Sequence, residues 1–92
     1  MMEFVIGRAV ISKKGRDKGR VFLVVGYLDD YVLIADGKLR KVEKPKKKNK
    51  KHLQLTKTIF DIEVINDNRL TYMSIKKEFK DKTAEQTEKN TE

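Results

Sequence analysis

The apolar residues of this chain occur in short runs that are separated by polar, glycine-containing segments. The runs 3–12, 20–27 and 31–35 are rich in valine, isoleucine, leucine and aromatic residues. Such residues favour strands, and several short runs of this kind are typical of a small antiparallel barrel. The run 20–27 is nearly all apolar, so we expect it to be buried on both faces. Gly7 interrupts the first run, which predicts a bend or the close approach of another backbone there.

The connections between these runs carry turn signals. Asp36 and Gly37 separate the run 31–35 from the run 38–42, and such a pair is typical of a tight hairpin with a type I′ turn. We therefore predict a hairpin at this point, and a plain turn at 28–30. The charged segment 43–51 contains the only proline and is predicted to be a solvated loop, with a brief closing strand or turn at 52–55.

The last third of the chain is less regular. The segment 59–65 alternates as a strand would, although a helical turn is also compatible with it, and 66–68 reads as a turn or a cap. Apolar residues at near-helical spacing predict one short helix over 70–80, packed on the barrel or binding a partner. The polar segment from Asp81 onward is expected to be disordered. The predicted organisation is thus a mainly β barrel over 1–58, an extension over 59–80 and a tail over 81–92.

Positive charge is concentrated in the first part of the chain. The formal net charge is +8, and residues 1–58 contain 16 lysines and arginines against 6 acids, whereas residues 59–92 contain 6 against 8. Such asymmetry indicates a polyanion-binding face on one module. DNA, acidic lipid or simple solubility would also account for the net charge alone.

Two clusters carry most of this charge. Glycines are interleaved with the first cluster, which lets backbone N–H groups approach a phosphate closely. Lysine makes point-charge contacts to phosphate, so recognition of backbone shape is expected more than recognition of sequence. Either cluster alone could be a solvated loop, but the two together favour nucleic-acid binding. The first cluster is Lys13, Lys14, Arg16, Lys18 and Arg20, and the second is Lys44, Lys46, Lys47, Lys48, Lys50 and Lys51.

The residue types needed for common catalytic sites are scarce. The chain has no cysteine and a single histidine, His52, which excludes thiolate chemistry, disulfides and a histidine metal cluster. No phosphate-binding glycine motif or nucleophile elbow is present. We expect a protein without catalysis, cofactor or metal. The longest apolar run, 21–25, is far too short to cross a bilayer, so we also expect a soluble, cytoplasmic protein.

Three ring side chains are candidates for contacts to bases. Tyr27 and Tyr31 could stack on unpaired bases, although barrel-core tyrosines with a hydroxyl at the rim are the more common arrangement. His52 could contact phosphate or a base, or serve a structural role.

The segment GRAVISKKGRDKGRVFLVVGYLDDYVLIADGKLRKV (7–42) resembles a KOW domain, the RNA-binding motif of several ribosomal proteins and of NusG-type transcription factors. The matching parts are the strand 10–12, the basic loop 13–18 that ends in Gly19, and the apolar strand 20–25. Gly19 stands at the position of the hallmark glycine. With 40–46 and His52-Leu53 added, residues 4–58 are similar to short bacterial relatives of the archaeal and eukaryotic large-subunit ribosomal protein of the "fourteen-e" type.

This resemblance implies an SH3-like barrel of about five strands that binds ribosomal or ribosome-associated RNA. Ribosomal or transcription proteins are further implied partners, and we expect a monomer when the protein is free. The residues implied as RNA contacts are Arg8, Lys13, Lys14, Arg16, Lys18, Gly19, Arg20, Arg40, Lys41, Lys44, Lys46, Lys47, Lys48, Lys50, Lys51 and His52.

Three other functions fit the same sequence. A transcription-linked KOW module would act mainly through protein contacts, at a barrel edge or the 70–79 helix. A DNA-compacting barrel would bind duplex DNA as tightly as RNA. A membrane-surface role is the weakest alternative, because the basic loops lack an accompanying apolar helix face.

Overall fold

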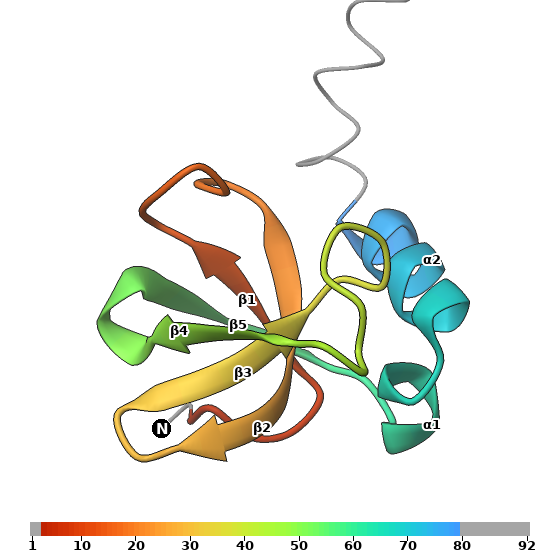
Figure 1. Ribbon diagram of the computed structural model, residues 1–92. Coiled ribbons are helices and arrows are strands. Elements are labelled where there is room, and N and C mark those ends of the chain that lie inside the picture. Colours follow the sequence, from red (N-terminus) through yellow and green to blue (C-terminus); the bar gives the residue numbers. More distant parts are fainter. Residues whose placement is uncertain (1–2, 80–92) are drawn as a thin grey trace, which may run out of the picture.

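The computed structural model describes residues 3–79, which form a mainly β domain with helices at its C-terminal side (Figure 1). Five antiparallel strands form one sheet in the order β4-β3-β2-β1-β5. The mainly β fold class and the five strands are confirmed. The elements are β1 (Arg8–Ser12), β2 (Val21–Leu28), β3 (Tyr31–Ala35), β4 (Lys46–Asn49), the 3₁₀ helix η1 (Lys50–His52), β5 (Leu53–Ile59), α1 (Ile62–Ile65) and α2 (Asn68–Glu78).

Alternate residues of a strand point to opposite faces of the sheet. In the central strands β1 and β2, both faces are covered. The interior of the barrel-like sheet is apolar, and the helices cover the outer face of the same two strands. Burial on both faces therefore explains the nearly continuous apolar run of β2, as the sequence predicts. The interior cluster is Val10, Phe22, Val24, Val32, Ile34 and Leu53. The outer cluster is Ala9, Val21, Leu23, Ile65 and Ile75.

Gly7 lies where the chain enters β1, and another backbone does pass close to it. Its φ angle is +91°, and a Cβ atom there would overlap the carbonyl of Phe60. The Gly7 N–H donates to the Val24 carbonyl at 2.8 Å, and the Phe60 N–H donates to the Gly7 carbonyl at 2.8 Å. Glycine at this position therefore allows the end of β5 to be fixed against the start of β1.

The predicted hairpin at Asp36-Gly37 is wrong. The tight two-residue connection is Asp29-Asp30, with Leu28 and Tyr31 paired at its base and Asp29 at a φ of +53°. Asp36 instead begins a long loop over 36–45, in which 38–42 form no strand. The Asp36 carboxylate accepts hydrogen bonds from the backbone N–H groups of Lys38 and Arg40, so the aspartate organises a loop rather than a type I′ turn.

The charged segment 43–51 is also not the solvated loop that its composition predicts. Residues 46–49 form β4, which pairs with β3 and lies at one edge of the sheet. Lys46 and Lys48 lie opposite Ile34 and Val32, so their stems belong to the interior face. The aliphatic part of a lysine can cover apolar surface, which explains how a run of lysines becomes a strand.

The C-terminal extension packs on the sheet. The ambiguous segment 59–65 divides between the end of β5 and α1, and the predicted 70–80 helix is α2. Asp67 caps α2, with its carboxylate accepting from the Leu70 N–H at 2.9 Å. The buried face of α2 carries Thr71 and Ile75, and the Thr71 hydroxyl donates to the Val64 carbonyl at 2.6 Å. The predicted disordered tail, 81–92, lies outside the described residues.

Candidate nucleic-acid interface

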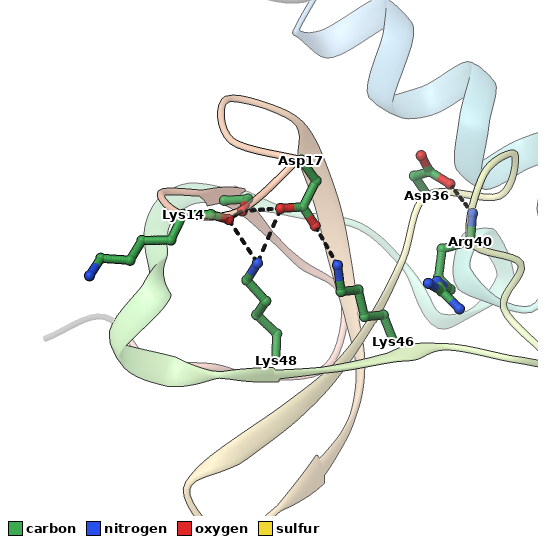
Figure 2. A network of polar contacts seen from close by, with 7 residues as sticks. Lys14, Asp17, Asp36, Arg40, Lys46 and Lys48 are labelled. Carbon is green, nitrogen blue, oxygen red and sulfur yellow. Dashed lines mark hydrogen bonds and ion pairs between the residues drawn. The ribbon is translucent and has the colours of Figure 1, made fainter.

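Asp17 is the one acid within the first basic cluster, and it is buried where that loop meets β4 (Figure 2). Its carboxylate accepts from Lys46 Nζ at 3.0 Å and from Lys48 Nζ at 3.1 Å. The Ser12 hydroxyl donates to the same carboxylate at 2.7 Å, and Lys48 Nζ also donates to the Lys14 carbonyl at 2.9 Å. Two lysines of the second cluster therefore tie down the loop that carries the first cluster.

The surroundings of Asp17 favour its charged form. Burial alone would raise the pKa of this carboxyl group, but hydrogen bonds from Ser12, Lys46 and Lys48, together with the charge of Lys48, lower the pKa from 3.8 to about 2. Because the folded-state pKa is below the unfolded value, this group stabilises the protein fully above pH 3.8 and progressively less as the pH falls to about 2.

We therefore expect the protein to lose stability as the pH falls from about 4 to 2. The free energy of unfolding, measured by urea denaturation at a series of pH values, should fall by about 2 kcal/mol between pH 4 and pH 2 through this group alone. The same series on Asp17→Asn should show a smaller fall, because the variant has no carboxyl group to protonate there. An equal fall in both proteins would contradict the assignment.

The 13–20 loop, η1 and the Asp29-Asp30 turn lie together on one side of the barrel, which we call the loop side (Figure 1). The Lys13 N–H donates to the His52 carbonyl at 2.8 Å, and the Lys50 N–H donates to the Asp30 carbonyl at 3.2 Å. Residues 12–20, 27–31 and 46–52 contain ten lysines and arginines against three aspartates. The structure thus brings the first basic cluster and the 46–51 part of the second cluster to one surface, whereas Lys44 lies on the preceding loop.

Exposure divides the predicted contact residues into three groups. The exposed ones are Lys13, Lys14, Arg16, Lys18, Gly19, Arg20, Arg40, Lys41, Lys44, Lys47 and Lys51. Lys46, Lys50 and His52 are half-buried, and Arg8 and Lys48 are buried. The exposed group is free to meet a ligand, whereas the buried pair contributes to the frame on which the loops rest.

Arg8 lies inside the domain at the first position of β1. One of its terminal nitrogens, Nη1, donates to the Thr56 carbonyl at 2.7 Å, which joins β1 to β5 across an irregularity in their pairing. Its Nε is buried without a partner among the described residues. Arg8 therefore does not extend the exposed surface of the loop side.

Gly19 closes the basic loop. Its φ angle is +88°, and its N–H donates to the Ser12 carbonyl at 2.8 Å. A Cβ atom at this position would have no neighbour within 4 Å. The backbone conformation, rather than a lack of space, is therefore what favours glycine here.

The two tyrosines at the tip of the β2–β3 hairpin have different settings. Tyr27 pairs with Val32 on the interior face but is half exposed at the rim. Tyr31 lies next to Lys47, whose Nζ is 4.9 Å from the ring centroid. Neither ring belongs to the core clusters, so both are available at the margin of the loop side.

Arg40, Lys41 and Lys44 are not on the loop side. They lie on the 36–45 loop, which contacts α2 (Figure 1).

The role of Asp17 is a part of the site that the sequence pattern did not reveal. A single acid among five cations was the available signal, because an isolated carboxylate in such a loop has several potential partners.

The described part of the chain has no group of three or more histidine and acidic side chains able to hold a metal ion. Within residues 3–79, no helix has the length and apolar character needed to cross a membrane. No protein-family model matches the chain, and no curated protein is significantly similar to it in sequence.

Proposed function

We propose that this protein binds structured RNA, with ribosomal or ribosome-associated RNA as the expected target, through the exposed cations of the loop side and without catalysis. The observation that supports this proposal most directly is the joining of the two basic clusters through Asp17. The KOW resemblance of residues 7–42 supports RNA over other polyanions.

The loop is fixed before any ligand arrives. Asp17 and Ser12 hold it from within, so Lys14, Arg16 and Lys18 project from a loop whose base is anchored. Ordering a loop on binding lowers affinity, and an anchored loop avoids part of that cost. Phosphate contacts of this kind make the affinity strongly dependent on salt.

The test compares two triple variants that remove the same charge from exposed positions. Lys14→Gln/Arg16→Gln/Lys18→Gln alters the loop side, and Lys57→Gln/Arg69→Gln/Lys77→Gln alters other surfaces. Binding to a fluorescently labelled RNA hairpin with a fully paired stem is followed by anisotropy over a range of salt concentrations. We expect the loop-side variant to bind at least about tenfold more weakly, with the log–log salt slope reduced by about 3, roughly one unit for each phosphate that is no longer bound.

Equal weakening by both variants would show that net charge alone drives binding and would contradict the proposal. Binding of a DNA duplex of the same sequence as tightly as the RNA would favour the DNA-compacting alternative. Co-sedimentation of the full chain with ribosomes at low and high salt then addresses the target. Salt-sensitive enrichment on large subunits is the expected result.

A protein-binding role has one specific observation in its favour. Leu70 and Met73 lie on α2 with about half of each side chain exposed. Association with a protein partner that persists in high salt, together with absence of RNA binding, would support the transcription-linked alternative.

A further inference from the structure

The 36–45 loop is folded tightly at its start. The Asp36 carboxylate accepts from Lys38 N–H at 3.0 Å and from Arg40 N–H at 2.9 Å. The backbone N–H groups of Asp36 and Gly37 both donate to the Arg40 carbonyl, at 3.0 and 3.1 Å. Residues 36–40 therefore form a compact turn with Leu39 near its tip.

Helix α2 holds this turn from one side. Gly37 lies against the Asn68 carbonyl and the Tyr72 N–H, so closely that no side chain would fit between them. The Asn68 side chain accepts from the Val42 N–H at 2.8 Å and donates to the Glu43 carboxylate at 2.8 Å. The first turn of α2 thus fixes two separate points of the loop.

The ammonium groups of two lysines lie near one tyrosine ring at this junction. Lys38 Nζ lies 5.1 Å from the Tyr72 ring centroid, and Lys76 Nζ of α2 lies 5.8 Å from the same ring. Among the residues described, Lys38 and Lys76 form no ion pair with a carboxylate. An aromatic ring attracts cations, so Tyr72 orients both lysines while leaving their charges unneutralised.

The tip presents an apolar side chain between cations. Leu39 is 63% exposed, and its neighbours Lys38, Arg40 and Lys41 are all exposed. A single exposed leucine is ordinary on a protein surface. A leucine that projects from a firmly held turn, with positive charge on both sides, has the form of an apolar wedge flanked by phosphate contacts.

We propose that the 36–45 loop is a second RNA contact, in which Leu39 packs on the face of an unpaired base while Lys38, Arg40 and Lys41 bind the phosphates beside it. This inference rests on the proposed RNA-binding function and specifies the class of RNA. A continuous duplex covers its base faces by stacking, whereas a bulge exposes one. The preferred ligand is therefore a helix with an unpaired nucleotide.

The experiment uses the full chain and two labelled RNA hairpins that have the same terminal loop and differ by one bulged nucleotide in the stem. Leu39→Ser is compared with Ile62→Ser, because Ile62 is 64% exposed and lies on α1. We expect wild type and Ile62→Ser to prefer the bulged hairpin. Leu39→Ser should bind the bulged hairpin about tenfold more weakly, the scale for re-exposing a leucine side chain, and should lose the preference.

The salt dependence of the affinity separates the apolar contact of Leu39 from the phosphate contacts of the neighbouring cations. Leu39→Ser should keep the wild-type salt slope, whereas Lys38→Gln/Arg40→Gln should lower it by about 2. Equal binding of both hairpins by wild type, or an unchanged preference in Leu39→Ser, would overturn the inference while leaving loop-side binding intact.

Binding to vesicles that contain phosphatidylserine tests the alternative in which the ligand is an anionic membrane surface. If wild type binds neither hairpin and instead binds phosphatidylserine-containing vesicles in a Leu39-dependent manner, both the RNA function and this inference are wrong. If Lys14→Gln/Arg16→Gln/Lys18→Gln weakens RNA binding and the Leu39 variant does not, only the inference fails.

Discussion

Replacing Asp17 by asparagine should lower the free energy of unfolding by about 3 kcal/mol, because it leaves the buried Lys48 ammonium without its counter-charge. Lys48 is 8% exposed, and Asp17 is the carboxylate that it contacts, at 3.1 Å. Lys46 should contribute less to this effect, since about a third of its side chain is exposed. The measurement is urea denaturation at pH 7, followed by circular dichroism.

Glu78→Gln is the matched control for this change. It removes the same charge at the exposed end of α2, so we expect its stability to stay within about 0.5 kcal/mol of wild type. Substituting Lys48 by methionine in the Asp17→Asn background should restore part of the lost stability, because no buried charge then remains. If Asp17→Asn were as stable as wild type, the carboxylate would not be holding the loop to β4.

Replacing Gly37 by alanine should also destabilise the domain by about 3 kcal/mol, since left-handed backbone strain is combined with overlap against α2. The φ angle of Gly37 is +83°, and a Cβ atom there would overlap the Asn68 carbonyl and lie close to the backbone nitrogen of Tyr72. The helix would have to move off the loop. Urea denaturation gives the stability, and hydrogen exchange of α2 amides shows whether the helix opens.

The variant Gly19→Ala separates the cost of backbone strain from the cost of overlap with a neighbouring element. Its φ angle is +88°, nearly that of Gly37, but nothing lies within 4 Å of its Cβ position. We therefore expect it to cost about 1 kcal/mol, from backbone strain alone. Equal costs at the two glycines would mean that α2 does not pack against the 36–45 loop as described.

Apolar patterning was enough to predict the barrel class, the strands within the three apolar runs and the C-terminal helix. Gly7 was correctly identified as a point of close backbone approach. The hairpin at Asp36-Gly37 was wrongly predicted because this pair has the preferred composition for a tight turn. The turn predicted at 28–30 is the tight connection, at Asp29-Asp30, although it has no glycine. At Asp36-Gly37, contact with α2 decides the conformation, and such a contact involves residues about thirty positions further along the chain.

The fourth strand could not be recognised from its residues. A strand of three lysines and an asparagine shows no alternation between apolar and polar residues. Its alternation is between lysines that bind Asp17 and a lysine that faces outward, and only the tertiary structure makes that distinction. The basic loops were predicted as a binding surface, but exposed lysines and lysines that support the interior are the same residue type in the sequence, so burial was needed to separate them.

The position of β4 at the edge of the sheet has a consequence for self-association. An unpaired edge offers free backbone groups to the strand of another molecule, which is a route to aggregation. Here that edge consists of Lys46, Lys47, Lys48 and Asn49. Lys46 and Lys48 are held by Asp17 on the interior side, so the exposed charge of this edge is that of Lys47. A second copy pairing edge to edge would bring a like charge near Lys47, and like charges at such a spacing repel. The basic composition of β4 therefore disfavours the addition of a strand from a second copy of the chain.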